Sequence, residues 1–297
     1  MKLITFSHEN RTRIGVHDGD SVVDLADAAP ALPTEMCAFL AAGRAALDAA
    51  RSAVAGDQGR LDAASVRLLA PIPKPSKVLA VGLNYRDHIE ETGMKTPEIP
   101  MIFNKQSTSV TGPFDPIHVP RASDKLDYEG ELAVVIGRRC RHVPRDRAAE
   151  VIAGYCVADD VSVRDWQMRS ATFTMGKSWD THCPLGPWLT TADEVEPHTL
   201  RLETWVNGEL RQNSNTEQLL FDCFTLVEHL STAFTLEPGD VISTGTPSGA
   251  GALMNPRKYL VAGDVVKVEI EGLGAIENTC IEEPADTVLI EPSDRIG

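Results

Sequence analysis

The stretch "DYEGELAVVIG", residues 127 to 137, places two carboxylates at the start of a predicted strand. The segment 132–136 is apolar and rich in β-branched residues, which favours a buried strand. Side chains two residues apart on a strand point to the same side, so Glu129 and Glu131 would face the same way, with Cα atoms about 6.6 Å apart. Their charges repel unless both face water on an edge strand or a cation lies between them.

A third carboxylate follows another apolar stretch. "ADDVSVRDWQ" places Asp159 and Asp160 directly after the strand-like segment 154–158. Three carboxylates with no neighbouring His or Cys ligand suit a hard cation such as Mg²⁺, Mn²⁺ or Ca²⁺. The spacing alone leaves open the alternative that the Glu pair lies on the solvated face of an edge strand.

Two further segments carry groups that could act on a substrate. "NYRDHIEETG" places His88 and Glu91 three residues apart, hence on one face of a predicted helix, where the carboxylate can orient the imidazole as a base. Lys177 follows a glycine in "MGKSWDTHCPLGPW". A solvated pair and a solvated lysine are the simpler alternatives. The Gly-rich "TGTPSGAG" (244–251) lacks the Gly-Lys-Ser/Thr of a phosphate loop.

Composition limits the classes of partner. The 297 residues contain 28 Lys and Arg against 43 Asp and Glu, a net charge of −15, which repels nucleic acids and anionic membranes. An anionic substrate would need local cations. The N-terminal residues lack the pattern of a signal peptide, and no apolar run reaches the ~20 residues of a membrane span. Six cysteines without a C-x-x-C pair predict reduced, mostly buried thiols and a cytoplasmic location.

The remaining pattern predicts alternating strands and helices. Short strands and an Ala-rich helix over 34–56 occupy residues 1–70, and the proline-rich 70–77 reads as a stiff connector. Later segments are expected to form a strand (78–83), a helix (84–93, with Asn84 near its start), a hairpin turning at Asn207-Gly208, a long helix (216–234) and a closing hairpin (264–283).

The order of these motifs resembles that of the fumarylacetoacetate hydrolase family, over roughly residues 75–283. The resemblance implies an α+β fold, with a mixed β-roll hydrolase domain over 77–285 and a small α+β N-terminal domain over 1–70. It also implies a homodimer.

The resemblance also implies functions for individual residues. It implies a divalent cation, usually Mg²⁺ with Mn²⁺ or Ca²⁺ as alternatives, on Glu129, Glu131 and Asp160. One departure is Val81, which stands where the namesake enzyme has a further aspartate ligand, so we expect water to complete the coordination. The other implied roles are a water-activating dyad on a lid (His88, Glu91), a lysine that binds substrate oxygens (Lys177), substrate contacts (Arg164, Gln167, Thr246) and a lysine near the pocket rim (Lys105).

The implied reaction is metal-dependent hydrolysis of a C–C bond in an acylpyruvate or other 2,4-dioxo acid, a diketo sugar acid included. Its products would be pyruvate or a related oxo acid plus a carboxylic acid. Decarboxylation of an oxaloacetate-type acid and isomerisation of a dienoate are the alternatives on the same site, and a non-catalytic metal-binding protein is the remote one. The expected partner is a small anionic oxo acid, with neither nucleic acid nor membrane.

Overall fold

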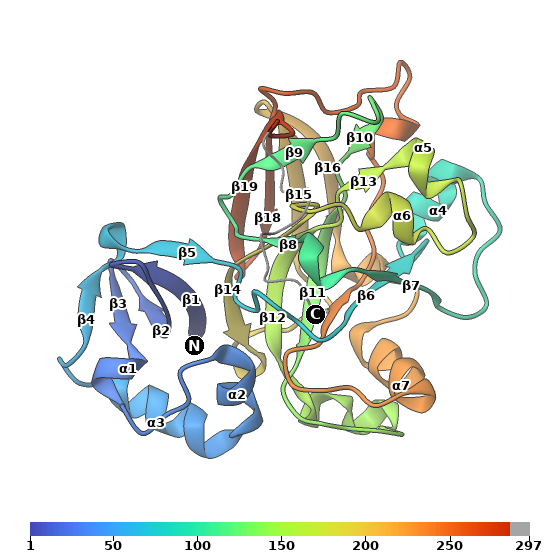
Figure 1. The fold of residues 1–297 in the computed structure, drawn as a ribbon. Coiled ribbons are helices and arrows are strands. Elements are labelled where there is room, and N and C mark those ends of the chain that lie inside the picture. Colours follow the sequence, from blue (N-terminus) through green and yellow to red (C-terminus); the bar gives the residue numbers. More distant parts are fainter. Residues whose placement is uncertain (286–297) are drawn as a thin grey trace, which may run out of the picture.

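The computed structural model describes residues 1–285 (Figure 1). Its largest sheet follows the order β4-β3-β2-β1-β14-β12-β11-β17-β6-β7, with β5 beside β1 and β8 beside β14. These strands are β1 (Lys2–His8), β2 (Arg11–Asp18), β3 (Ser21–Asp24), β4 (Arg60–Asp62), β5 (Arg67–Leu69), β6 (Val78–Gly82), β7 (Met101–Lys105), β8 (Val110–Thr111), β11 (Gly130–Ile136), β12 (Ile152–Asp159), β14 (Cys183–Thr191) and β17 (Val241–Ser243).

A second sheet covers one face of the first, in the order β16-β15-β18-β19-β9, and β10 pairs with β13. Its hairpins are those that the sequence predicts: Asn207 and Gly208 both have positive φ between β15 and β16, and β18 pairs with β19. The strands are β9 (Ile117–Val119), β10 (Leu126–Asp127), β13 (Ser162–Val163), β15 (Arg201–Val206), β16 (Glu209–Asn215), β18 (Val265–Ile270) and β19 (Gly274–Glu282).

The helices are shorter than predicted. The single helix expected over 34–56 is wrong, because it is split at Gly43, whose φ of +70° leaves the helical region. The helix expected over 216–234 starts only after Asp222, whose side chain caps it. The α-helices are α1 (Leu25–Ala28), α2 (Met36–Ala41), α3 (Arg44–Val54), α4 (Arg86–Thr92), α5 (Arg164–Gln167), α6 (Thr174–Lys177) and α7 (Cys223–Ala233), and the 3₁₀ turns are Ala63–Ser65, Ser107–Ser109, Arg145–Glu150, Ala192–Glu194, Thr216–Gln218 and Gly251–Leu253.

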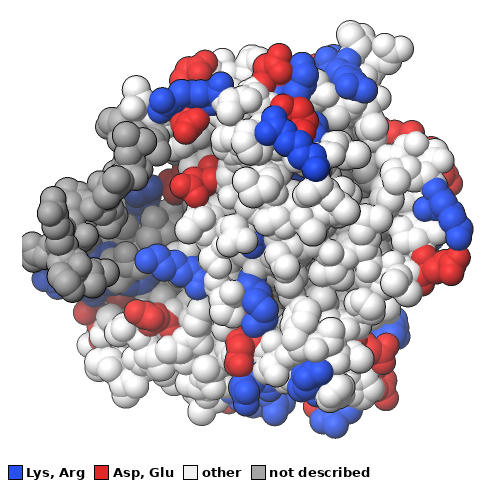
Figure 2. Space-filling view, turned by 45° about the vertical axis from the view of Figure 1, so that its right-hand side comes forward, with Lys and Arg blue, Asp and Glu red and all other residues white. Residues whose placement is uncertain are grey.

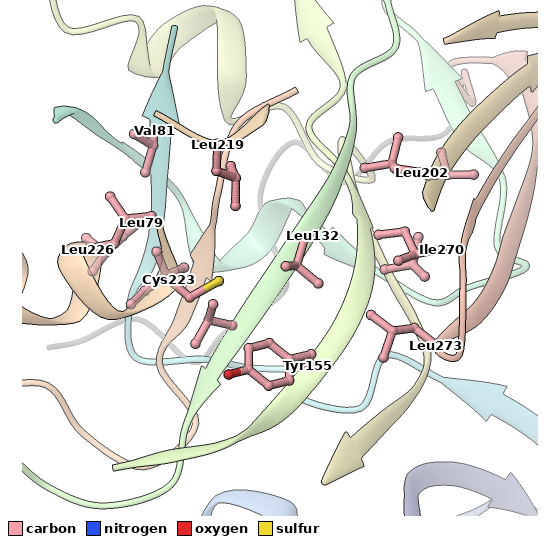
Figure 3. Packing of buried hydrophobic residues seen from close by; sticks show 14 of the residues in the cluster. Leu79, Val81, Leu132, Tyr155, Leu202, Leu219, Cys223, Leu226, Ile270 and Leu273 are labelled. Carbon is pink, nitrogen blue, oxygen red and sulfur yellow. The ribbon is translucent and has the colours of Figure 1, made fainter. Parts of the chain in front are cut away.

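The position of β11 in the fold explains why its sequence is apolar at consecutive positions. Alternate side chains point to opposite faces, and both faces are covered. Leu132 and its even-numbered neighbours join the core between the two sheets and α7, where Figure 3 shows Leu132 and Tyr155 facing Leu226 on one side and Ile270 on the other. The odd-numbered Ala133 and Val135 pack instead against the N-terminal region. The two carboxylates therefore lie at the start of a strand in the middle of the sheet, Glu129 just before it and Glu131 within it.

The N-terminal strands continue the same sheet. β1 pairs with β14 through Lys2↔Thr190 and Leu3↔Leu189, so hydrogen bonds cross from residues 1–70 into the larger part of the chain. The fold is α+β, with mixed sheets that do not close within the described residues: three strand pairs, β6–β17, β8–β14 and β9–β19, are parallel. The division into domains at 70–77 stays a prediction.

Candidate active site

Antiparallel pairing brings the three predicted ligands together. Gly130 at the start of β11 lies opposite Asp159 at the end of β12, which places Glu129 and Glu131 beside Asp160. Carboxylate oxygens of these three buried residues lie within 4.8 Å of one another. The alternative of a solvated edge strand is wrong, because β11 lies between β12 and β17 and the two glutamates are buried.

Hydrogen bonds fix Glu131 within the cluster and hold the neighbouring Asp159 away from it. Glu131 Oε2 accepts from Ser243 Oγ at 2.6 Å and from the backbone N–H of Gly245 at 2.8 Å. Asp159 Oδ1 accepts from the backbone N–H of Glu129 at 2.8 Å. Asp159 is thus turned toward the backbone and lies outside the cluster, whereas Asp160 faces into it.

Two buried lysines pair with the cluster. Lys177, at the end of α6, donates to Glu129 Oε2 and, at 2.7 Å, to Asp160 Oδ2. Lys105 donates to Asp160 Oδ1 at 2.6 Å, and its side chain is 0% exposed. The expectation that Lys105 lies near the pocket rim is therefore wrong, because its ammonium group is enclosed beside Asp160.

Arg164 links the cluster to a residue that sequence reasoning missed. Its guanidinium pairs with Asp127 Oδ2 at 2.8 Å and with Glu129 Oε1 at 2.7 Å, and Nη1 donates to Gln167 Oε1 at 3.0 Å. Asp127 also accepts from the backbone N–H groups of Gly251 (2.9 Å) and Ala252 (3.0 Å). Its position at the head of the same acidic stretch was the available signal.

The network is short of positive charge. It contains four carboxylates but only three cations, so with all four carboxylates ionised it carries one net negative charge in a largely buried site. Burial, reinforced by the charges of Asp160 and Glu129, raises the pKa of Glu131 well above its usual range. Burial also opposes ionisation of Glu129, but Arg164 and Lys177 outweigh it and hold its pKa well below the usual range. A divalent cation would supply the missing charge.

The predicted dyad of His88 and Glu91 lies on helix α4, which hydrogen bonds hold over the carboxylate cluster. His88 Nδ1 lies 3.0 Å from Glu91 Oε2, and Glu91 Oε1 accepts from the backbone N–H of Gly249 at 2.9 Å. Asp87 accepts from Ser214 Oγ at 2.6 Å, which fixes the same helix α4 to β16. The predicted start at Asn84 is wrong, since its side chain bonds instead to backbone groups of Thr244 and Phe221.

A cavity of about 610 Å³ connects these parts. Thr246 lines it, but its hydroxyl already donates to the carbonyl of Gly130 (2.9 Å) and accepts from Gln212 Nε2 (2.8 Å). Gln212, a second residue missed in the sequence, also accepts from Gly130 N–H at 2.9 Å and so ties the loop 244–251 to the start of β11. The predicted residues that line the cavity are His88, Glu129, Glu131, Arg164, Gln167, Lys177 and Thr246.

The face that carries α4, α5 and α6 is largely uncharged. Figure 2 shows a broad surface without Lys, Arg, Asp or Glu in the middle of this face, with charged groups mainly toward its margins. Exposed methionines of this region include Met94, Met101 and Met168, all of which line the cavity.

Comparison with known proteins supports the family that the order of the motifs indicates. The profile described as fumarylacetoacetate (FAA) hydrolase C-terminal matches residues 77–281. The chain belongs to the fumarylacetoacetate hydrolase family. The mitochondrial oxaloacetate tautomerase fahd2 of Xenopus laevis is 44% identical over 288 residues, which cover 95% of this chain and 90% of that protein.

Two solved structures show the same fold. Fumarylacetoacetate hydrolase of Exiguobacterium antarcticum is 39% identical with a TM-score of 0.84, covering 95% of this chain and 100% of that one. Maleylpyruvate hydrolase of Sphingobium sp. SYK-6, in complex with manganese(II) and pyruvate, is 32% identical with a TM-score of 0.80, covering 96% and 100%. The family thus includes enzymes named as tautomerases and as hydrolases, and one neighbour holds a divalent metal.

Two further predictions, on the cysteines and on membrane-spanning helices, can be compared with the structure. All six cysteines are free and four are buried, as predicted. No helix within residues 1–285 is long and apolar enough to cross a membrane. The cytoplasmic location stays a prediction, and the mitochondrial description is that of the relative.

Proposed function

We propose that this protein is a divalent-metal-dependent enzyme that interconverts the keto and enol forms of a 2-oxo diacid of the oxaloacetate type. The observation that carries the proposal is the His88–Glu91 dyad, fastened over the carboxylate cluster in one cavity. The identity of the substrate is suggested by the tautomerase relative, which is 44% identical over 95% of the chain.

The donor set fits a hard divalent cation. Glu129, Glu131 and Asp160 offer only oxygen, are buried, and belong to a network that lacks positive charge. We propose Mg²⁺ as the resident ion, with Mn²⁺ or Ca²⁺ as alternatives. A cation at this site would act as a Lewis acid toward the 2-oxo group and make the C3 protons more acidic.

The side chains of the chain supply the proton transfer. With the Glu91 carboxylate accepting at Nδ1, the proton resides on Nδ1 and His88 Nε2 is free to take a proton from C3. A proton returned to the 2-oxo oxygen then completes the enol, so no atom is gained or lost. The amide nitrogen of Gln167 is free to donate to a substrate oxygen, because its oxygen is engaged by Arg164.

Hydrolysis of an acylpyruvate or other 2,4-dioxo acid is the second candidate. It is favoured by the likeness to maleylpyruvate hydrolase and by the same dyad, because His88 could equally deprotonate a water molecule that attacks the distal carbonyl. Lys177 would have to share its ammonium group between Glu129, Asp160 and the developing negative charge. Decarboxylation remains an outcome of the test, and dienoate isomerisation remains an alternative on the same site.

The test is a substrate panel with the metal controlled. Oxaloacetate tautomerisation is followed by the ultraviolet absorbance of the enol, and acylpyruvate cleavage and decarboxylation by NMR of the products. We expect a tautomerisation rate above the spontaneous one that EDTA abolishes and Mg²⁺ or Mn²⁺ restores. Cleavage of acylpyruvates without tautomerisation would replace the proposal by its second candidate, and full activity in EDTA would refute the metal requirement.

The homodimer also stays a proposal. The exposed methionines beside the cavity are apolar enough to be covered by a second copy of the chain. Light scattering at several concentrations would measure the mass directly, and a monomer throughout would refute it.

A further inference from the structure

The cavity contains two cations that the carboxylate cluster does not neutralise. Its lining includes Lys125, Arg164, Lys177 and Arg257. Arg164 and Lys177 are both paired with buried carboxylates. Lys125 and Arg257 remain, at a part of the lining formed by other segments of the chain.

Tyr259 brings these two cations together. Lys125 Nζ lies 5.1 Å from the centre of the Tyr259 ring, and Arg257 Nη1 donates to the Tyr259 hydroxyl at 3.4 Å. Within residues 1–285, the carboxylate paired with Lys125 is that of Asp124, which is 87% exposed and lies at 3.1 Å, and such a pair contributes little in water. No Asp or Glu within residues 1–285 forms an ion pair with Arg257, although its neighbour Lys258 pairs with Glu209.

The segment that carries Arg257 is held at both ends. The Asp127 carboxylate binds the backbone N–H groups of Gly251 and Ala252, and the N–H of Leu260 donates to the carbonyl of Leu126 at 2.8 Å. Both anchors belong to β10, which directly follows Lys125 in the chain. One short strand therefore positions both unneutralised cations, so their proximity is built into the fold.

We propose that Arg257, with Lys125 and the Tyr259 hydroxyl, forms a subsite for the carboxylate of the substrate that is remote from the metal-binding cluster. This inference rests on the proposed action on a 2-oxo diacid and assigns the residues that would select dianionic 2-oxo acids over monoanionic ones. In a chain of net charge −15, two local cations offset the repulsion that a dianion meets. Arginine suits this role because its planar guanidinium binds a carboxylate through two parallel hydrogen bonds.

Binding of a matched pair of ligands tests the subsite without turnover. In the metal-loaded protein, calorimetry compares 2-oxoglutarate with 2-oxopentanoate, a five-carbon acid that lacks only the second carboxylate. We expect tighter binding of the diacid, and in Arg257→Gln a loss of about 10-fold for the diacid alone. Lys258→Gln is the matched control, since it removes a neighbouring charge that pairs with Glu209 outside the cavity lining.

Turnover gives a second readout. The ratio of kcat/KM for oxaloacetate to that for its 4-methyl ester should fall in Arg257→Gln and, to a smaller extent, in Tyr259→Phe. An unchanged preference, or equal weakening of both members of each pair, would overturn the subsite while the proposed function stands. If neither 2-oxo acid binds the unaltered protein and oxaloacetate is not tautomerised, the proposed function itself is refuted and the subsite with it.

Discussion

The floor and the rim of the cavity are built differently. The floor, which we define as Glu129, Glu131, Asp160 and Lys177, has side chains no more than 9% exposed, each held by ion pairs or hydrogen bonds. The rim groups are less enclosed: the side chains of His88 and Glu91 are 12% and 25% exposed, and Arg257 lies at the surface.

This contrast indicates which groups of the cavity can change at low cost. A buried, paired network tolerates little change, because removing one partner leaves an uncompensated charge in a poorly solvated place. Exposed groups on a short helix and a loop can change at low cost. We therefore expect substitutions at the rim to change the reaction or the substrate more readily than substitutions at the floor.

The largest effect is expected at the centre of the floor. Asp160→Asn removes the charge that pairs with Lys105 and Lys177, both buried, so it should lower both metal affinity and stability. We expect metal affinity to fall by at least about 100-fold and the free energy of unfolding by about 3–5 kcal/mol. Calorimetric titration with Mn²⁺ and urea unfolding measure the two, with the exposed Asp124→Asn as control. Unaltered metal affinity would break the assignment of the floor as a metal site.

At the rim, His88→Gln should separate catalysis from binding. Loss of a general base typically costs 10²–10⁴-fold, so we expect kcat to fall at least about 100-fold while metal affinity is unchanged. His229→Gln, on α7 outside the cavity lining, is the control. Decarboxylation of oxaloacetate should persist, because it needs no base. Tautomerisation at the unaltered rate would refute the role of the dyad.

The two lysines on Asp160 should behave differently despite their shared partner. Lys177 lines the cavity and Lys105 does not. We expect Lys177→Met to lower kcat by about 10- to 100-fold, since it removes a charge beside the reacting oxygens. Lys105→Met should act mainly through metal affinity and stability, with kcat at saturating metal close to that of the unaltered protein. A larger kcat loss in Lys105→Met would contradict the structure's placement of the two side chains.

Much of the floor could be predicted, because the spacing of its glutamates and the order of the motifs are visible in the sequence. The spacing of Glu129 and Glu131 fixes a common side of a strand, and the family resemblance supplied Asp160 as their partner. The sequence could not show that β11 is central, because an apolar strand with two leading carboxylates fits an edge equally well. Only the pairing with both β12 and β17 decides it.

The errors arose where tertiary contacts override local signals. Asparagine is a residue type that often caps helices. The side chain of Asn84 instead forms hydrogen bonds with the backbone of Thr244 and Phe221, which are distant in sequence. Lys105 is drawn inward by Asp160, which a sequence pattern does not reveal. Gln212 acts by binding the backbone N–H of Gly130, distant in sequence, so no spacing rule identifies it, and Asp127 shows only its place in the acidic stretch and not the loop that it binds.

The smallest expected effect concerns a buried framework residue near the floor. His182 Nε2 lies 2.8 Å from the carbonyl of His118, and its Nδ1 has no hydrogen-bond partner within residues 1–285. Burial, reinforced by the positive charge of Lys105, lowers the pKa of His182 to about 3. Between that value and the unfolded pKa of about 6.5, the unfolded chain binds one more proton at this site than the folded protein.

It follows that His182 stabilises the fold fully above pH 6.5 and that this contribution is lost as the pH falls toward 3. The slope is at most about 1.4 kcal/mol per pH unit. In His182→Gln, whose amide can still donate to the His118 carbonyl, the free energy of unfolding in EDTA should decline less steeply between pH 6.5 and 4.5. His229→Gln, on α7, is the histidine control. If the His182→Gln slope equals that of the unaltered protein, the acid sensitivity does not come from His182, and the carboxylates of the floor account for it.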